Sequence, residues 1–217
     1  GGEALRDVLW WLAVGTMLVG NVMAVIQENV KRLLAYSSVA HAGYLLMGLV
    51  AGSQAGSSGM LFYLIAYTFT NLGAFGVIIA LTHRGQEVDR LEDFAGLARS
   101  RPVLAALMTL FMVSLAGMPG TAGFFGKLQV FLAAVREGYV GLTIIAVLTS
   151  LVSFYYYLRL PVVMYMREPG AELPRMLQQE VVRLLPRLFT HLRVGADLPA
   201  DQGLEPAHDA LANGRGT

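Results

Sequence analysis

A lysine inside a long apolar stretch is the residue of this sequence with the clearest chemical potential. Lys127 lies in residues 104–135, where nearly every other side chain is apolar or small. Gly117, Pro119 and Gly120 precede it. Proline removes a backbone donor and clashes with the preceding turn, and glycine lowers helix stability, so a helix through this stretch is predicted to break there. The stretch therefore predicts a broken membrane helix that holds a buried amine, which is by default a candidate functional group.

The depth of Lys127 supports this interpretation. It lies nine residues before Arg136, which marks the end of the stretch. At about 1.5 Å per residue the lysine is roughly 13 Å inside that end, too deep for its amine to reach water easily. A buried lysine can exchange protons with its surroundings. The alternative is a lysine that pairs with an acid on another helix and only holds the bundle together.

A histidine in a second apolar stretch is the next candidate. His41 shares one helix face with Ser37 and Tyr44, at spacings of four and three residues. Histidine titrates near neutral pH and suits a proton relay. It can equally be a hydrogen-bonded contact between helices, as Ser, Thr and His often are in membrane bundles. Both interpretations stay open.

Lys31 and its neighbour Arg32 stand in the polar connection 27–32. A basic pair at a membrane boundary is explained by the preference of positive charge for the cytoplasmic side. The functional alternative is that Lys31 takes up protons from the cytoplasm.

Other polar side chains recur at helical spacing and are interpreted as contacts between helices. Arg159 is expected to reach the interface from within the last apolar stretch. The recurring residues are Tyr63, Tyr67 and Asn71 in one stretch and Thr149, Ser153 and Tyr157 in another.

Composition indicates the class of protein that positions these residues. The chain has 217 residues, of which 55% are hydrophobic and 14% charged, and its mean hydropathy is +0.56. Soluble domains are about one-quarter charged, so an all-α polytopic membrane protein is predicted. A net charge of +1 gives no indication of nucleic-acid binding. The absence of cysteine excludes disulfides, cysteine-ligated zinc and cysteine-bound iron–sulfur clusters on this chain.

About five transmembrane helices are expected, the fourth of them broken at Gly117–Gly120. The fourth span is expected at 102–136, which is 35 residues. A straight helix of that length would be roughly 50 Å long, whereas the hydrocarbon core is about 30 Å thick. An uncharged turn is predicted at 52–59, and a short surface helix at 91–98. The expected spans are about 5–26, 33–51, 60–82, 102–136 and 139–166.

Basic residues predict the orientation, with the N-terminus outside and the C-terminus cytoplasmic. Lysine and arginine gather between the first and second spans, between the third and fourth, and after the fifth. The transmembrane bundle is assigned to residues 1–167. Residues 168–217 are expected to form a cytoplasmic tail, amphipathic at 175–193 and disordered from 195. Since Gly1 is not an initiator methionine and no signal peptide follows, the chain is expected to be a piece of a longer protein.

Two motifs resemble a known family. The segment Asn29–Tyr44 reads NVKRLLAYSSVAHAGY, and residues 114–127 contain SLAGMP followed by GFFGK. Both resemble segments of the antiporter-like membrane subunits of respiratory complex I, and the resemblance covers roughly residues 5–167. Multisubunit cation/proton antiporters share these motifs.

The resemblance implies a fold and a site. The family has fourteen helices with two inverted five-helix repeats, and the five spans here would be its ninth to thirteenth, part of the second repeat. Lys127 would be the terminal lysine of the family's proton path, with Lys31 and His41 as further members. The path's glutamate and two other lysines belong to helices that these residues do not include.

The resemblance also implies an activity. The chain would be a proton-translocating subunit of NADH:quinone oxidoreductase, a translocase that couples electron transfer from NADH to quinone to proton pumping through buried lysines. It would carry no cofactor, because NADH, FMN, iron–sulfur clusters and quinone would bind other subunits. Its partners would be the lipid bilayer and neighbouring antiporter-like subunits in the cell inner (plasma) membrane, with no nucleic acid. The alternative is a subunit of a multisubunit cation/proton antiporter without electron transport.

Overall fold

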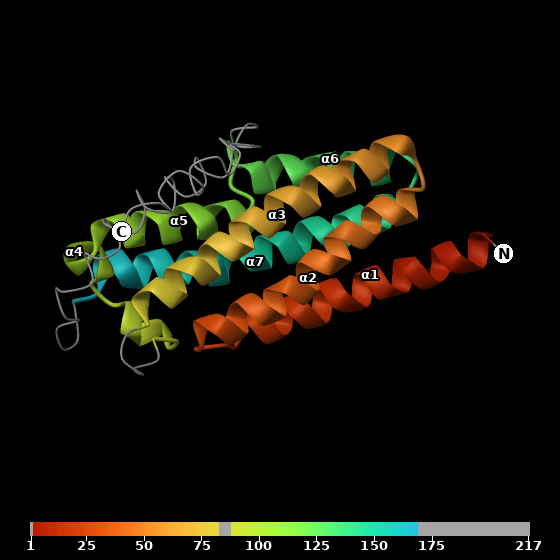
Figure 1. The fold of residues 1–217 in the computed structure, drawn as a ribbon. Helices are drawn as coiled ribbons and strands as arrows, with labels where there is room; N and C mark the ends of the chain where they lie inside the picture. The colour runs from red at the N-terminus through yellow and green to blue at the C-terminus, as the bar shows by residue number, and fades with distance from the viewer. Residues whose placement is uncertain (1, 83–87, 169–217) are drawn as a thin grey trace, which may run out of the picture. The chain divides into compact units, whose positions relative to one another are not determined.

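Eight helical segments make up the part of the chain that the computed structural model describes, residues 2–82 and 88–168. The four long helices α1, α2, α3 and α7 are long and apolar enough to cross a membrane. The described residues form no strand, only an isolated bridge between Asn29 and Arg90. The predicted all-α polytopic fold is confirmed. The elements are α1 Gly2–Val25, α2 Val30–Ala51, α3 Gln54–Leu81, η1 Leu91–Phe94, α4 Leu97–Ser100, α5 Pro102–Ala116, α6 Ala122–Arg136 and α7 Val140–Met166 (Figure 1).

The surface of this bundle differs from that of a soluble protein, because it carries many large apolar side chains. Large apolar side chains such as Phe69, Ile79 and Leu151 are exposed on its outer face. Lys127 and His41 are buried inside it. An apolar surface of this extent requires a lipid environment or a partner. The distribution therefore fits helices whose apolar faces meet lipid and whose polar groups meet one another.

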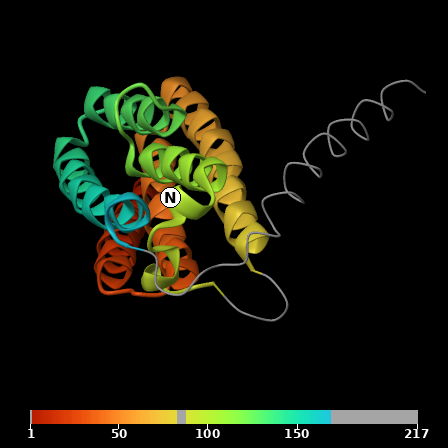
Figure 2. The same ribbon diagram turned by 90° about the vertical axis from the view of Figure 1, so that its left-hand side faces the viewer.

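The two shorter helices α5 and α6 follow each other along the bundle between α3 and α7. Both α3 and α7 contact each of them, and α1 packs against α2 and α7. Figure 2 shows the green α5 and α6 between the orange-to-yellow α3 and the blue-green α7. The arrangement places the helix ends that flank the break beside α3 and α7, while Pro119 and Gly120 within the break are exposed.

Two helices begin earlier than predicted, because polar residues cap their first turns. The Asn29 side chain accepts a hydrogen bond from the Arg32 amide, so α2 starts at Val30 and contains Lys31. The Ser53 hydroxyl accepts from the Gly56 amide, so α3 starts at Gln54. The predicted turn at 52–59 and the predicted connection at 27–32 are therefore each too long.

The prediction of one surface helix at 91–98 is wrong. The segment forms η1 and then α4, and Phe94 and Leu97 are completely buried. Two backbone hydrogen bonds join its start to the loop between α1 and α2. The Leu91 amide donates to the Glu28 carbonyl at 2.8 Å, and the Val30 amide donates to the Asp89 carbonyl at 2.6 Å. Anchored at this point, the segment packs inward against α7.

Most of the predicted cytoplasmic tail, including the amphipathic segment 175–193, lies outside the described residues.

Candidate functional site

The break between α5 and α6 is built by residues 117–121. Gly117 adopts a left-handed backbone with a φ of 84°, a conformation that favours glycine, and ends α5. Its amide donates to the Ser114 carbonyl, and the Met118 amide donates to the Val113 carbonyl. The Thr121 side chain accepts from the Phe124 amide and starts α6. The structure therefore has the break where Gly117, Pro119 and Gly120 predict it.

Lys127 lies in the second turn of α6, and its amine reaches back to the end of α5. The Lys127 Nζ donates to the carbonyls of Leu115 and Ala116, each at 3.2 Å, and to the Ser150 hydroxyl of α7 at 3.1 Å. The last carbonyls of a helix lack partners within the helix and carry its negative dipole end. Broken backbone therefore supplies the surroundings that a buried cation needs.

Uncharged groups complete the surroundings of Lys127. Its amine lies 5.0 Å from the centroid of the Tyr44 ring, within cation–π range. The side chain is only 4% exposed. All its hydrogen-bond partners in residues 2–82 and 88–168 are uncharged. Pairing with an acid, the structural alternative for this lysine, is not found within the described part of the chain.

His41 stands at the centre of a cluster of tyrosines. Its Nδ1 is hydrogen-bonded to the Tyr63 hydroxyl, and its Nε2 to the Tyr157 hydroxyl at 2.9 Å. The ring of Tyr67 stacks on the imidazole, with centroids 4.7 Å apart. A neutral imidazole has one donor and one acceptor nitrogen, and each hydroxyl can take either complementary role. Tyrosines from the polar stripes of α3 and α7 thus contact His41 on both sides of its ring.

Tyr44 lies between the histidine and the lysine, and hydrogen bonds to α1 and α7 hold its hydroxyl. The Asn21 amide nitrogen donates to the Tyr44 hydroxyl at 3.3 Å, and that hydroxyl donates to Thr149 at 3.2 Å. The Tyr156 hydroxyl donates to the Asn21 Oδ1 at 3.1 Å. Sequence reasoning missed Asn21, Tyr156 and Ser150. Asn21 had a usable signal, since it is a lone amide in an otherwise apolar span.

Two further basic residues lie apart from Lys127. Lys31 is in the first turn of α2, ten residues before His41, which is about 15 Å along the helix axis. Arg159 was expected to extend to the interface. Its Nη1 donates at 3.1 Å to the Val25 carbonyl at the end of α1, so the guanidinium lies beside a helix end, and the expectation stays a prediction. The structure brings Lys127 and His41 into one region but leaves Lys31 at the end of the bundle.

A cavity of about 370 Å³ adjoins the Lys127 amine. The turn between α5 and α6 supplies Pro119, α6 supplies Phe124 and Phe131, and α7 supplies Val147 and Phe154. Most of this lining is apolar. In addition, no group of three metal-ligating side chains is found among the described residues. Lys127 and His41 are titratable, so proton exchange is chemistry that their amine and imidazole can perform.

Together, the bundle, the broken helix and the buried amine define a multi-pass membrane protein built to keep polar groups at membrane depth. The family model for the membrane domain of the NADH:quinone oxidoreductases and Mrp antiporters matches residues 2–153. This chain belongs to that family. The match covers α1 to α6 and the first half of α7, so it includes Lys127, His41 and Ser150.

Curated relatives agree with the subunit that the sequence resembles most. Lys127, together with the upstream Ser37–His41 segment, is most similar to subunit N of NADH:quinone oxidoreductase. The NADH-quinone oxidoreductase subunit N of Trichlorobacter lovleyi is 55% identical over 166 residues, which are 76% of this chain and 34% of that protein. The protein of the same name from Paramagnetospirillum magneticum is 48% identical over 167 residues. This chain spans about a third of the length of these relatives.

Solved structures share the fold. A chain of respiratory complex I from Thermus thermophilus, determined with bound aureothin, is 35% identical with a TM-score of 0.65, over 87% of this chain and 44% of that one. A chain of the Mrp complex from Dietzia is 28% identical with a TM-score of 0.71, over 76% of this chain and 31% of that one. Both sides of the family, the respiratory and the antiporter complexes, therefore contain this arrangement of helices.

Proposed function

We propose that this chain is part of the proton-translocating subunit N of an NADH:quinone oxidoreductase, a translocase in which electron transfer from NADH to quinone drives proton pumping. The observation that carries the proposal is the Lys127 amine, buried at the break and held by two helix-end carbonyls and the Ser150 hydroxyl. A buried ionisable residue that faces the bundle interior is typical of ion paths in membrane proteins. The names of the curated relatives support the choice of complex.

The three titratable residues have distinct roles in this proposal. Lys127 holds a proton when its ammonium donates to the carbonyls of Leu115 and Ala116, and it releases the proton when the charge of its surroundings changes. His41 relays protons, because the hydroxyls of Tyr63 and Tyr157 contact both of its nitrogens. Lys31, at the start of α2, takes up protons from the cytoplasm.

The proposed orientation puts the N-terminus of this chain outside and its C-terminus in the cytoplasm, in the cell inner membrane. The basic residues at the starts of α2 and α5 and the end of α7 support it through the positive-inside preference. Lys127 then lies in the outer half of the membrane, on the outlet side. NADH, FMN, the iron–sulfur clusters and quinone bind other subunits of the complex, and neighbouring antiporter-like subunits pack beside this chain.

The experiment that tests the complex assignment uses inverted membrane vesicles from cells that express the full subunit. We expect NADH oxidation to acidify these vesicles, and we expect the acidification to require both quinone and the gene for this chain. A pH-sensitive dye gives the measurement. Vesicles that lack the subunit but acidify normally contradict the proposal.

A second candidate function is a subunit of a multisubunit cation/proton antiporter without electron transport. The similarity to the Mrp complex of Dietzia, with a TM-score of 0.71, favours it. In that case an imposed sodium gradient drives proton movement in the same vesicles without NADH, and deletion of the chain abolishes this exchange.

We expect His41→Phe to slow proton pumping severalfold while the complex still assembles. Phenylalanine fills a similar volume but cannot bond to the hydroxyls of Tyr63 and Tyr157. General acid–base groups commonly contribute about a hundredfold or more, so a severalfold loss is a conservative expectation. The measurement is the number of protons moved per NADH oxidised. A matched control is Tyr36→Phe on the same helix, because the Tyr36 hydroxyl takes no part in the hydrogen bonds that hold His41. Full pumping by His41→Phe contradicts the relay role.

A further inference from the structure

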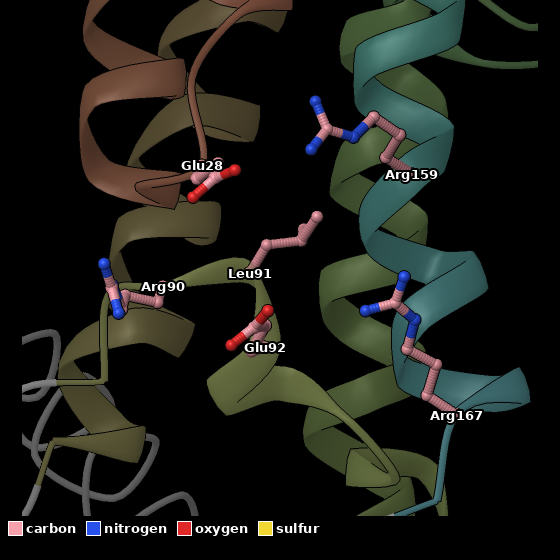
Figure 3. A pocket seen from close by; sticks show the side chains of 6 residues that line it. All are labelled: Glu28, Arg90, Leu91, Glu92, Arg159 and Arg167. Carbon is pink, nitrogen blue, oxygen red and sulfur yellow. The ribbon is translucent and has the colours of Figure 1, made fainter.

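A second cavity, of about 180 Å³, lies where α1 and α7 end and η1 begins. Its lining is mostly charged, unlike that of the cavity beside Lys127. The lining residues are Glu28, Arg90, Leu91, Glu92, Arg159 and Arg167 (Figure 3). The proton path proposed above uses none of them.

The positively and negatively charged side chains of this cavity lie on opposite sides of it. Figure 3 shows Arg159 and Arg167 projecting from α7 into the space, with Glu28 and Glu92 facing them from the opposite side. Arg90 lies beyond Glu28, and its guanidinium is turned away from α7. Two positive groups therefore face two negative groups across the cavity.

These opposite charges do not contact one another. No ion pair joins the two glutamates to the two arginines in the part of the chain that the structure describes. Arg159 uses one of its N–H groups to bond the Val25 carbonyl, and a guanidinium has five. The two sides are thus separated by a space that a ligand with charges of both signs would fill.

The cavity also lies at the boundary between lipid and water. The chain beside it carries apolar side chains that are at least about half exposed, among them Ile26 directly after α1 and Val162 and Met166 near the end of α7. Helix ends of this kind, with apolar residues before polar ones, lie at the level of the lipid headgroups. A ligand at this depth can therefore have hydrocarbon chains that lie against α1 and α7.

We propose that this cavity binds the headgroup of a phospholipid with a phosphate and a primary amine, of the phosphatidylethanolamine class. Arg159 and Arg167 hold the phosphate, because guanidinium groups match phosphate oxygens well. Glu28 and Glu92 accept hydrogen bonds from the ammonium. An anionic headgroup without an amine meets two uncompensated carboxylates, and a choline headgroup has no N–H to donate. The proposal depends on the membrane location of the chain and not on proton pumping.

The test is lipid retention by the membrane complex that contains this chain. The complex is purified, stripped of lipid in detergent and exposed to defined mixtures of phosphatidylethanolamine, phosphatidylcholine and phosphatidylglycerol, and bound lipids are counted by native mass spectrometry. We expect the double variant Arg167→Gln, Glu92→Gln to lose one equivalent of phosphatidylethanolamine, with affinity at this site at least about tenfold weaker. The unaltered complex should prefer phosphatidylethanolamine to the other two lipids.

The matched control is the double variant Arg136→Gln, Glu137→Gln, which removes one charge of each sign from exposed positions outside the cavity. It should retain lipid as the unaltered complex does. The single variants Arg167→Gln and Glu92→Gln should each weaken retention, so the site remains testable if the double variant assembles poorly. Equal retention by the cavity variants and the control, or a preference for phosphatidylcholine or phosphatidylglycerol, overturns the proposal.

Discussion

Replacement of Lys127 by methionine is expected to lower proton pumping by at least about tenfold, with the complex assembled and NADH still oxidised. Methionine has a similar length and suits the apolar cavity beside α6, but it carries no proton. The carbonyls of Leu115 and Ala116 and the Ser150 hydroxyl lose their shared donor. Because helix-end carbonyls at a break can bond water, the fold should tolerate the change better than the proton path does.

Two measurements distinguish a loss of proton transfer from a loss of assembled complex. The ratio of protons moved to NADH oxidised reports the path, and the amount of complex in native gels reports assembly. Arg136→Met is the matched control, because it removes an exposed cation at the end of the same helix. Normal proton pumping by Lys127→Met contradicts the role proposed for this lysine. The role is also contradicted if Arg136→Met loses as much proton pumping as Lys127→Met does.

The second large effect is expected from Gly123→Ala, which should prevent the assembly of the subunit. Gly123 is in the first turn of α6, and a methyl group there would overlap the backbone carbonyl of Ser114 in α5. Overpacking a tight site usually costs about 1–3 kcal/mol, and more where backbone has to move. The two half-helices would separate, and Lys127 would lose its position beside the α5 carbonyls.

The amount of subunit in the membrane, measured by immunoblot, and the thermal midpoint of the purified complex test this expectation. Gly76→Ala is the control, since a methyl group at this helical position in α3 meets no neighbouring atom within 4 Å. The control should assemble normally. A Gly123→Ala complex with normal abundance and an unchanged midpoint would show that the contact between α5 and α6 is adaptable.

Much of the fold follows from hydropathy, but the helix starts depend on single side chains. The apolar spans are long enough to be recognised whatever single residues they contain. Their number and the position of the break are therefore predictable. The start of α3 was misplaced because glycine and serine between 52 and 59 are typical of a turn. Ser53 caps the helix there, and close packing of Gly56 against the Gly48 carbonyl of α2 favours small residues.

The candidate site is less predictable, because its contacts join distant parts of the chain. Helical spacing showed that His41 and Tyr63 each lie on a polar face. It did not show that these faces meet, since that depends on how α2 and α3 pack. The uncharged surroundings of Lys127 could not be predicted from the sequence either. Every residue has a backbone carbonyl, so residue types do not indicate which carbonyls bond the amine. The buried positions of Phe94 and Leu97 were missed for a related reason, as a short charged loop does not reveal what it packs against.

The break also affects how the chain enters the bilayer during synthesis. Each half-helix has 15 residues and is about 22 Å long, shorter than a hydrocarbon core of about 30 Å. The second half carries a lysine, so its own transfer from the translocon into lipid is unfavourable. Gly126 of α6 packs closely against Tyr63 of α3. Because α3 is synthesised earlier, it provides a surface against which α6 can pack. Biogenesis of this segment is therefore expected to be cooperative, with α6 leaving the translocon together with its neighbours.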